Sequence, residues 1–158
     1  MNSSAPDVQD VNTNTLPDDP QALAELTAQT MYAGDQASQA LGAQVVSVAP
    51  GKASMSMTVR SDMLNGHKTC HGGFIFALAD SAFAFACNSR NAVTVASGCT
   101  IDFLAPAFEG DVLTARADEY SLAGRTGVYD VHVSKQDGTR VAVFRGRSYR
   151  IKGQVVET

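Results

Sequence analysis

The chain has 158 residues, of which 44% are hydrophobic and 18% charged, and its formal net charge at pH 7 is −4. This size and apolar content predict one domain with a substantial core, and the near-neutral charge argues against a nucleic-acid-binding protein. No apolar run is long enough to span a membrane, and the N-terminus lacks the basic and hydrophobic blocks of a secretory signal, so we expect a cytoplasmic protein.

The negative charge is concentrated at the start of the chain. Asp7, Asp10, Asp18 and Asp19 equal the whole net charge, and the remaining residues carry as many bases as acids. Because this segment is also rich in Ser, Asn and Pro, we expect a disordered acidic tail over residues 1–20. The folded domain is then expected over residues 21–152, with a C-terminal tail over residues 153–158.

The first half of the domain predicts a helix followed by a hairpin. Apolar residues recur at helical spacing over residues 20–41, with an interruption near Gly34. Residues 43–60 alternate apolar and polar positions on either side of Pro50-Gly51, which is typical of two strands joined by a turn. The apolar residues that form these period-two ladders are Val46, Val48, Ala53, Met55, Met57 and Val59.

The second half predicts one long helix and then strands. Residues 73–88 are rich in Ala, Phe and Leu on all sides, so this helix has no polar face for water. Four strands are expected at 93–104, 112–122, 127–135 and 140–151, with turn signals between them. The fold class is therefore α+β, with an antiparallel sheet of about six strands wrapped around one long central helix.

Asp80 is the only acid within the apolar helix. Burying an unpaired carboxylate is costly, so such a residue is either satisfied by partners or retained for chemistry. His71-Gly72-Gly73 stands at the expected helix start, where unobstructed backbone N–H groups suit a negative oxygen. Gly72 and Asp80 lie roughly 12 Å apart along one helix, too far to act on one carbonyl. If both are catalytic, two subunits must pair.

The cysteines and histidines do not indicate a metal site or a disulfide framework. Cys70, Cys87 and Cys99 are odd in number and lack C-x-x-C spacing, so we expect reduced thiols and no cofactor. His67 and His71 have the spacing of zinc-binding helices, but the glycines around them indicate a loop. A Cys70–His71 nucleophile pair is disfavoured, because adjacent side chains in an extended loop point in opposite directions.

The order of elements and motifs resembles the hotdog-fold acyl-CoA thioesterases of the phenylacetate-degradation type, over about residues 25–152. The resemblance is carried by Asn65-Gly66-His67, Cys70-His71-Gly72-Gly73, Leu78-Ala79-Asp80-Ser81-Ala82-Phe83-Ala84, Cys87-Asn88-Ser89, Cys99-Thr100-Ile101-Asp102-Phe103-Leu104, Gly127-Val128-Tyr129-Asp130-Val131 and Phe144-Arg145-Gly146. In that family two protomers pair their sheets edge to edge, and dimers commonly assemble into tetramers. The resemblance thus implies a homodimer as the minimal active unit and a homotetramer.

The resemblance also implies roles for individual residues. Asp80 is expected to be the catalytic carboxylate, acting as nucleophile or as general base, and the Gly72 N–H of the opposite subunit the oxyanion donor. Asn65 is expected to orient the thioester or the attacking water, with His71 beside it in a structural or polarising role. Ser81 stands where the family commonly has Thr, and its retained hydroxyl is expected at the substrate.

Further residues are candidates for binding substrate. Gly73 adds a second unobstructed N–H, and the Ser97 hydroxyl could hold water or the product carboxylate. Arg90 and Arg125 could contact the phosphates of coenzyme A, although each taken singly is more often a solvated surface base. Aromatic residues that could line an aryl pocket, or else belong to the core, are Phe74, Phe83, Phe85 and Phe103.

These expectations favour one function over two others. The first is hydrolysis of aryl-acetyl-type thioesters, such as phenylacetyl-CoA and its ring-hydroxylated relatives, to free acid and coenzyme A. A second is an enoyl-thioester hydratase or dehydratase on the same fold, for which His71 is the only nearby acid–base partner. A third is a non-catalytic acyl-CoA-binding module. Fold alone does not choose among them.

Overall fold

The computed structural model describes residues 15–158, so most of the tail expected over residues 1–20 lies outside the described residues. Helix α1 (Pro20–Gly34) starts after Asp19, whose side chain accepts a hydrogen bond from the Ala22 N–H at 2.8 Å. Asp19 is thus an N-cap, and Pro20 occupies the first helical position, where its missing N–H costs nothing. Helix α2 (Gln36–Ala40) follows directly, so the predicted interruption near Gly34 is confirmed.

Strands β1 (Gln44–Ala49) and β2 (Lys52–Thr58) form the predicted antiparallel hairpin. A bulge between Val45 and Ser47 changes the alternation of β1. Val45 and Val48 therefore pack against the core, while Val46 is 60% exposed. The predicted period-two ladder was wrong at Val46, because Val46 is the extra residue of the bulge and lies on the solvent side. Strand β2 alternates as expected, with Ala53, Met55 and Met57 buried.

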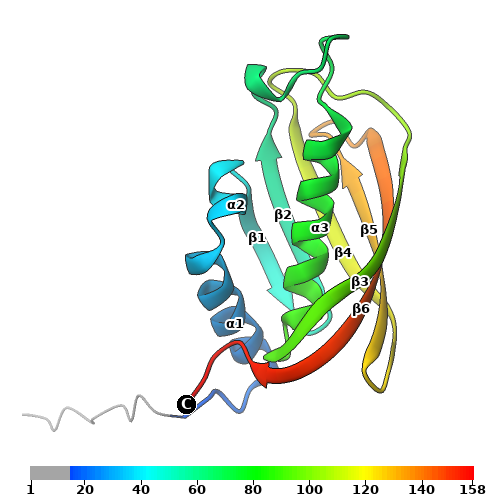
Figure 1. Cartoon of the computed structure of the whole chain (residues 1–158). Coiled ribbons are helices and arrows are strands. Elements are labelled where there is room, and N and C mark those ends of the chain that lie inside the picture. Colours follow the sequence, from blue (N-terminus) through cyan, green and yellow to red (C-terminus); the bar gives the residue numbers. More distant parts are fainter. Residues whose placement is uncertain (1–14) are drawn as a thin grey trace, which may run out of the picture.

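The long central helix is α3 (Gly72–Asn88), preceded by a short 3-10 turn, η1 (Ser61–Met63). Its buried residues lie on most sides of the helix, and Leu78, Ala79 and Ala82 are fully inaccessible to solvent. Figure 1 shows the sheet curving around this helix, and the side of α3 that includes Gly73, Ala77 and Asp80 stays partly accessible to solvent. Within residues 15–158, no helix is long and apolar enough to cross a membrane.

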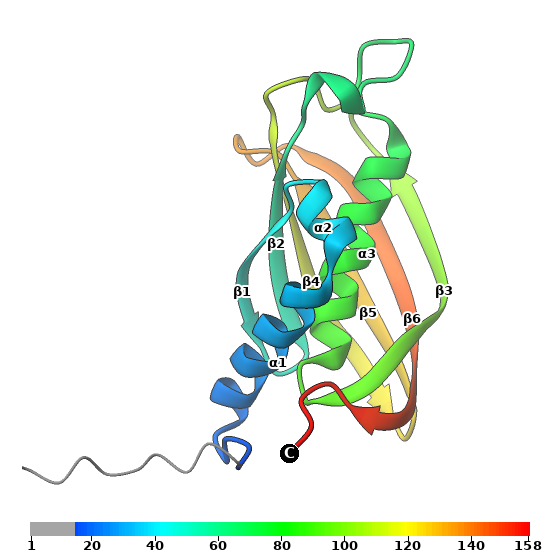
Figure 2. The same cartoon turned by 60° about the vertical axis from the view of Figure 1, so that its left-hand side comes forward.

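The remaining strands are β3 (Ala92–Phe103), β4 (Val112–Ala123), β5 (Thr126–Ser134) and β6 (Arg140–Gln154). All neighbours pair antiparallel, in the order β1-β2-β4-β5-β6-β3. Figures 1 and 2 show α3 inside the curve of this sheet and α1 beside it, along β1. The α+β fold with six strands around one helix is confirmed, and β1 and β3 are the two edges.

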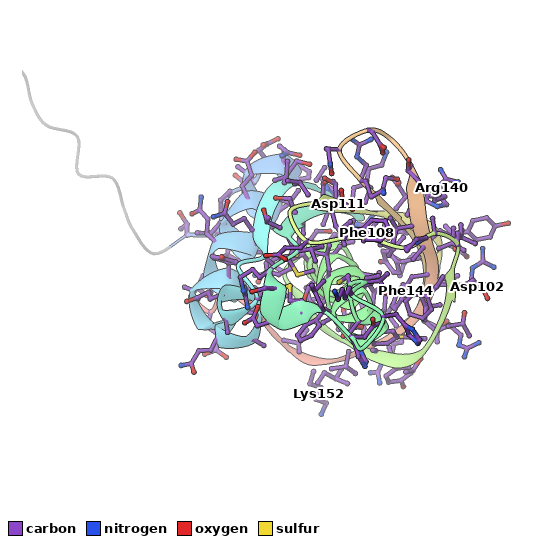
Figure 3. The ribbon with its side chains drawn as sticks, turned by 90° about the horizontal axis from the view of Figure 1, so that it is seen from above. Asp102, Phe108, Asp111, Arg140, Phe144 and Lys152 are labelled. Carbon is purple, nitrogen blue, oxygen red and sulfur yellow. The ribbon has the colours of Figure 1, made fainter. Side chains whose placement is uncertain are left out.

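The two faces of the sheet differ in chemistry. Tyr129, Val131 and Phe144 point toward α3 and are almost completely buried. On the opposite face, Arg145 forms two hydrogen bonds with Asp130, at 2.7 and 2.8 Å. Figure 3, which looks along α3 from above, places Phe144 on the inner side of the sheet. This alternation builds the core on one side and leaves charged pairs on the other.

The C-terminal end of α3 is tied to the sheet by polar contacts. Arg90 donates to both carboxylate oxygens of Glu119, at 2.6 and 3.2 Å, and the Tyr129 hydroxyl donates to Glu119 at 2.9 Å. The Ser89 hydroxyl accepts from the Gly51 N–H at 2.8 Å, which connects α3 to the β1–β2 turn. Burial opposes ionisation of Glu119, but the bonds from Arg90 and Tyr129 outweigh it and lower its pKa. This end of α3 is therefore fixed to β4 and β5.

Candidate active site

The loop before α3 is held rigidly against the rest of the protein. Leu64 and Cys70 form an antiparallel bridge across it. The Cys70 N–H donates to the Ala107 carbonyl at 2.8 Å, and the His71 N–H donates to the Met63 carbonyl at 2.8 Å. These bonds satisfy the backbone just before the helix begins. The start of α3 is therefore fixed in position.

His71 is the N-cap of α3, and because of this cap the N–H groups of Gly72 and Gly73 differ in hydrogen bonding. Its Nδ1 accepts a hydrogen bond from the Gly73 N–H at 3.0 Å, so the neutral ring carries its proton on Nε2. The Gly72 N–H has no acceptor among residues 15–158. An unsatisfied donor at a helix N-terminus is suited to an anionic oxygen. The available N–H is thus that of Gly72, whereas that of Gly73 is already bonded.

The absence of a side chain at Gly72 leaves room for the ring of Phe103 beside the helix start. A Cβ built on this residue would lie 2.9 Å from Cζ of Phe103, closer than van der Waals contact allows. Phe103 is 53% exposed, unlike Phe83 and Phe85, which are 1% exposed and belong to the core. Gly72, Ile75 and Phe103 line a cavity of about 490 Å³ beside the helix start. An apolar space therefore adjoins the free N–H.

Asp80 lies eight residues further along the same helix and is half-buried. Its Oδ1 is 3.9 Å from Sγ of Cys99 on β3, the one side-chain hydrogen bond to this carboxylate within residues 15–158. Burial raises the pKa of Asp80, and the Cys99 contact offsets part of that rise. A desolvated carboxylate with one weak donor is more basic and more nucleophilic than a solvated one.

Gly72 and Asp80 cannot serve one reaction centre within a protomer. The chain is continuously helical from Gly72 to Asn88. Eight residues of helix separate the two groups by roughly 12 Å along the axis. A site that uses both groups needs a second copy of the chain.

Asn65 is placed in the same loop, with its amide oxygen fully engaged. Oδ1 accepts from the His67 N–H at 2.9 Å and from the Thr69 N–H and hydroxyl, each at 3.2 Å. These contacts orient the amide, because backbone donors identify which atom is oxygen. Within residues 15–158, Nδ2 has no acceptor, so the amide presents two free donors.

A comparison with known proteins identifies the family. The family model described as the thioesterase superfamily matches residues 67–142. The acyl-coenzyme A thioesterase PaaI of Escherichia coli K12 is 51% identical to this chain over 128 residues, which make up 81% of this chain and 91% of that protein. The chain belongs to the thioesterase superfamily. Within it, this protein is a hotdog-fold thioesterase of the PaaI type, as the sequence motifs predict.

Solved structures agree with this assignment. The E. coli PaaI protein, from the phenylacetic acid degradation operon, superposes with a TM-score of 0.85 at 48% identity, covering 86% of this chain and 99% of that one. A mutant of PaaI from Thermus thermophilus has a TM-score of 0.72 at 44% identity, covering 74% and 100%. A Streptococcus mutans protein bound to acetyl-CoA has a TM-score of 0.68 at 25% identity, covering 71% and 90%.

The two serines expected at the substrate are engaged within the protomer of this thioesterase. The Ser81 hydroxyl is 3.1 Å from the Ser38 hydroxyl of α2, and Ser38 in turn bonds Asp35 at 2.5 Å. The exposed Ser97 hydroxyl donates to the Arg147 carbonyl at 3.1 Å, next to a bulge in β3. Ser97 thus remains accessible, whereas Ser81 is tied to α2.

The two arginines expected at coenzyme A lie at the opposite end of α3. Arg90, Arg125 and Arg150 line a small cavity of about 60 Å³ there. Within one protomer this is roughly 27 Å along the helix axis from Gly72. Arg90 is committed to Glu119, whereas Arg125 is exposed at the β4–β5 turn. The structure does not bring either residue to Gly72 of the same subunit.

Sequence reasoning missed the contact of Cys99 with the carboxylate. The sequence spacing of the three thiols says nothing of which groups face them. Cys99 and Ile101 are two residues apart on β3 and point toward α3, on the same face as Asp80. The alternation of β3 was the signal that could have placed Cys99 beside the helix.

Proposed function

We propose that this protein hydrolyses acyl-CoA thioesters of the aryl-acetyl class, with phenylacetyl-CoA and its ring-hydroxylated relatives as the first candidates, and releases the free acid and coenzyme A. The observation that carries the proposal is the half-buried Asp80, with its raised pKa, on the same helix as the free Gly72 N–H. The 51% identity to the E. coli acyl-coenzyme A thioesterase supports the substrate class.

The chemistry needs an attacking oxygen and a donor for the oxyanion. In one route Asp80 takes a proton from water, and the resulting hydroxide attacks the thioester carbon. In the other route the carboxylate attacks directly, and water then hydrolyses the anhydride. In both, the carbonyl oxygen becomes negative and is stabilised by the Gly72 N–H, and the carbon–sulfur bond breaks as the oxyanion collapses. The coenzyme A thiolate leaves readily and takes up a proton.

Two subunits share each site in this proposal. Strand β3 is an edge strand with an unpaired side, and its exposed residues include Val95 and Phe103. Pairing β3 with β3 of a second copy satisfies this edge. It also brings α3 of one subunit toward the other, so that Asp80 of one subunit meets Gly72 of its partner. We therefore propose a homodimer as the active unit and a homotetramer as its assembly.

The loop residues support the reacting groups. The free Nδ2 of Asn65 donates to the thioester carbonyl or to the attacking water. His71 caps Gly73 and thereby aims the first turn of α3, so its role is to position the Gly72 N–H. Ser97 holds water or the product carboxylate, and Arg125 contacts a coenzyme A phosphate.

A cytoplasmic location is part of the same proposal, and the thiols support it. Cys70, Cys87 and Cys99 are all unpaired. Free thiols persist in reducing compartments, which supports the cytoplasm as the place of action.

Thiol release tests the proposal. We expect turnover of phenylacetyl-CoA by the native protein, followed with a disulfide dye, and a loss of about a hundredfold or more in Asp80→Ala and Asp80→Asn. Because the three cysteines also react with the dye, each sample needs a blank without substrate. Melting temperature and assembly size show whether the variants are folded.

Other outcomes identify the alternatives. Absence of thiol release from aryl and aliphatic acyl-CoAs would contradict a thioesterase. Consumption of an enoyl thioester without thiol release would favour a hydratase, and a raised melting temperature with acyl-CoA but no turnover would favour a binding module.

A further inference from the structure

Cys99 contacts the Asp80 carboxylate, but the hydrolysis steps proposed above give it no role. It lies on the edge strand β3, and its Sγ is 3.9 Å from Oδ1 of Asp80 across the gap between strand and helix. Its neighbours on the inner face are set by the pairing of β3 with β6, where Cys99 stands opposite Gly146. The thiol is therefore aimed at the carboxylate by the sheet register.

The direction of this hydrogen bond follows from the groups around it. Burial and the nearby Asp80 raise the pKa of Cys99, while Arg147 on β6 lowers it slightly. The other thiol near Asp80 is Cys87 on α3, whose burial raises its pKa to about 12. Both thiols are thus protonated at neutral pH, so the Cys99 S–H donates and the Asp80 carboxylate accepts.

We propose that Cys99 is a positioning residue for hydrolysis: its S–H holds Oδ1 of Asp80 in one orientation by a bond that is weak enough to leave the carboxylate basic. The inference rests on the catalytic role of Asp80 proposed above. It assigns no chemical step to the sulfur itself.

Because the Cys99 S–H is a weak donor, it lowers the basicity of Asp80 only slightly. A base or nucleophile works best when its pKa lies near the operating pH, and each strong donor to the charged form moves the pKa of a carboxyl downward. A thiol is a poor donor compared with a hydroxyl. Cys99 therefore restrains the carboxylate at less cost in basicity than serine would.

The test is the pH dependence of kcat/KM for phenylacetyl-CoA in three variants, followed by the loss of thioester absorbance. In Cys99→Ser the acid limb is expected to move to lower pH by about half a unit, because the hydroxyl stabilises the charged carboxylate more strongly. In Cys99→Ala the limb is expected to move to higher pH, and kcat to fall by roughly three- to tenfold as the orientation is lost.

Cys87→Ala is the matched control. Cys87 is a buried thiol on α3 near Asp80, but it donates to the Ala84 carbonyl at 3.5 Å instead of to the carboxylate. This variant removes a thiol from the same region, so it reports any effect of packing alone. We expect its acid limb to coincide with that of the native protein.

The outcomes separate this inference from the proposed function. An acid limb that is unchanged in both Cys99 variants, or that moves equally in Cys87→Ala, overturns the positioning role while Asp80→Asn remains inactive. Activity retained in Asp80→Asn overturns the Asp80 mechanism and the role of Cys99 together. Because Cys99→Ser is nearly isosteric, unfolding of the alanine variant does not prevent the decision.

Discussion

At the scale of single residues, the start of α3 assigns a different task to each residue. Nδ1 of His71 caps the helix by accepting a hydrogen bond from the Gly73 N–H, whereas the Gly72 N–H has no acceptor among residues 15–158. A Cβ at Gly72 would also meet the Phe103 ring, which would have to turn away. The effect of a Cβ at this position and the effect of losing the backbone N–H can therefore be separated by mutation.

Gly72→Pro should remove the donor and keep the helix. Proline is tolerated at the first helical position, and His71 already has the extended backbone (φ −60°, ψ 132°) that a residue before proline adopts. We expect kcat to fall by about 10²–10³, the usual cost of one oxyanion donor.

Gly72→Ala is the comparison for that experiment. It introduces the same Cβ against Phe103 but keeps the N–H, and the exposed end of the ring has room to turn away. We expect kcat within about tenfold of native, since the oxyanion donor is retained. Equal losses in the two variants would show that crowding, and not the N–H, is responsible.

Several of these residues were predictable from the sequence. An acid within an apolar helix, eight residues after His71-Gly72-Gly73, predicts a carboxylate and a free N–H without any structure. The difference between Gly72 and Gly73 was not predictable, because it depends on which nitrogen of His71 accepts a hydrogen bond. The Cys99–Asp80 contact was not predictable either, because β3 and α3 come together only through the curvature of the sheet.

At the scale of elements, α3 is held at both ends. Its N-terminus follows a loop bonded to Met63 and Ala107, and its C-terminus is fixed through Arg90, Glu119 and Tyr129. The sequence predicted the helix well, because an apolar run without Gly or Pro has few alternatives. It did not predict the bulge at Val45–Ser47, since nothing in the local pattern marks the extra residue.

Glu119→Gln should weaken the attachment of α3 to the sheet. The change removes the negative charge to which Arg90 and Tyr129 donate hydrogen bonds. We expect the free energy of unfolding at pH 7 to fall by roughly 1–2 kcal/mol. The pKa of Glu119 is lower in the folded than in the unfolded chain. Its contribution is therefore complete above the unfolded value of 4.5 and is lost as the pH falls through the lower folded value.

Urea unfolding at two pH values, at one protein concentration, measures this. The difference between native protein and Glu119→Gln should be full at pH 7 and should shrink at pH values below 4.5. Asp118→Asn is the control on the neighbouring residue, because its pair with Lys52 is exposed and 3.6 Å long. We expect almost no change there. A difference between Glu119→Gln and native protein that persists in acid would contradict this account of Glu119.

At the scale of the whole molecule, one protomer holds the two groups of the proposed site too far apart to meet. Continuous helix separates Gly72 from Asp80, and within residues 15–158 β3 has no partner strand on one side. That a site using both groups would need a second subunit was deducible from the spacing alone, because the rise of a helix is constant. The way in which two sheets pair is a property of shape, which the sequence conveyed only through the family resemblance.

Subunit complementation tests the shared site most directly. Asp80→Asn and Gly72→Pro each inactivate the protein alone, but a mixed dimer contains one site in which both groups are intact. When the two variants are co-expressed with separate tags, we expect thiol release from phenylacetyl-CoA by the unfractionated mixture to recover to about a quarter of native. Random pairing makes half of the dimers mixed, and each mixed dimer has one intact site of its two. Mixed dimers that remain as inactive as their parents would contradict a site built from two subunits.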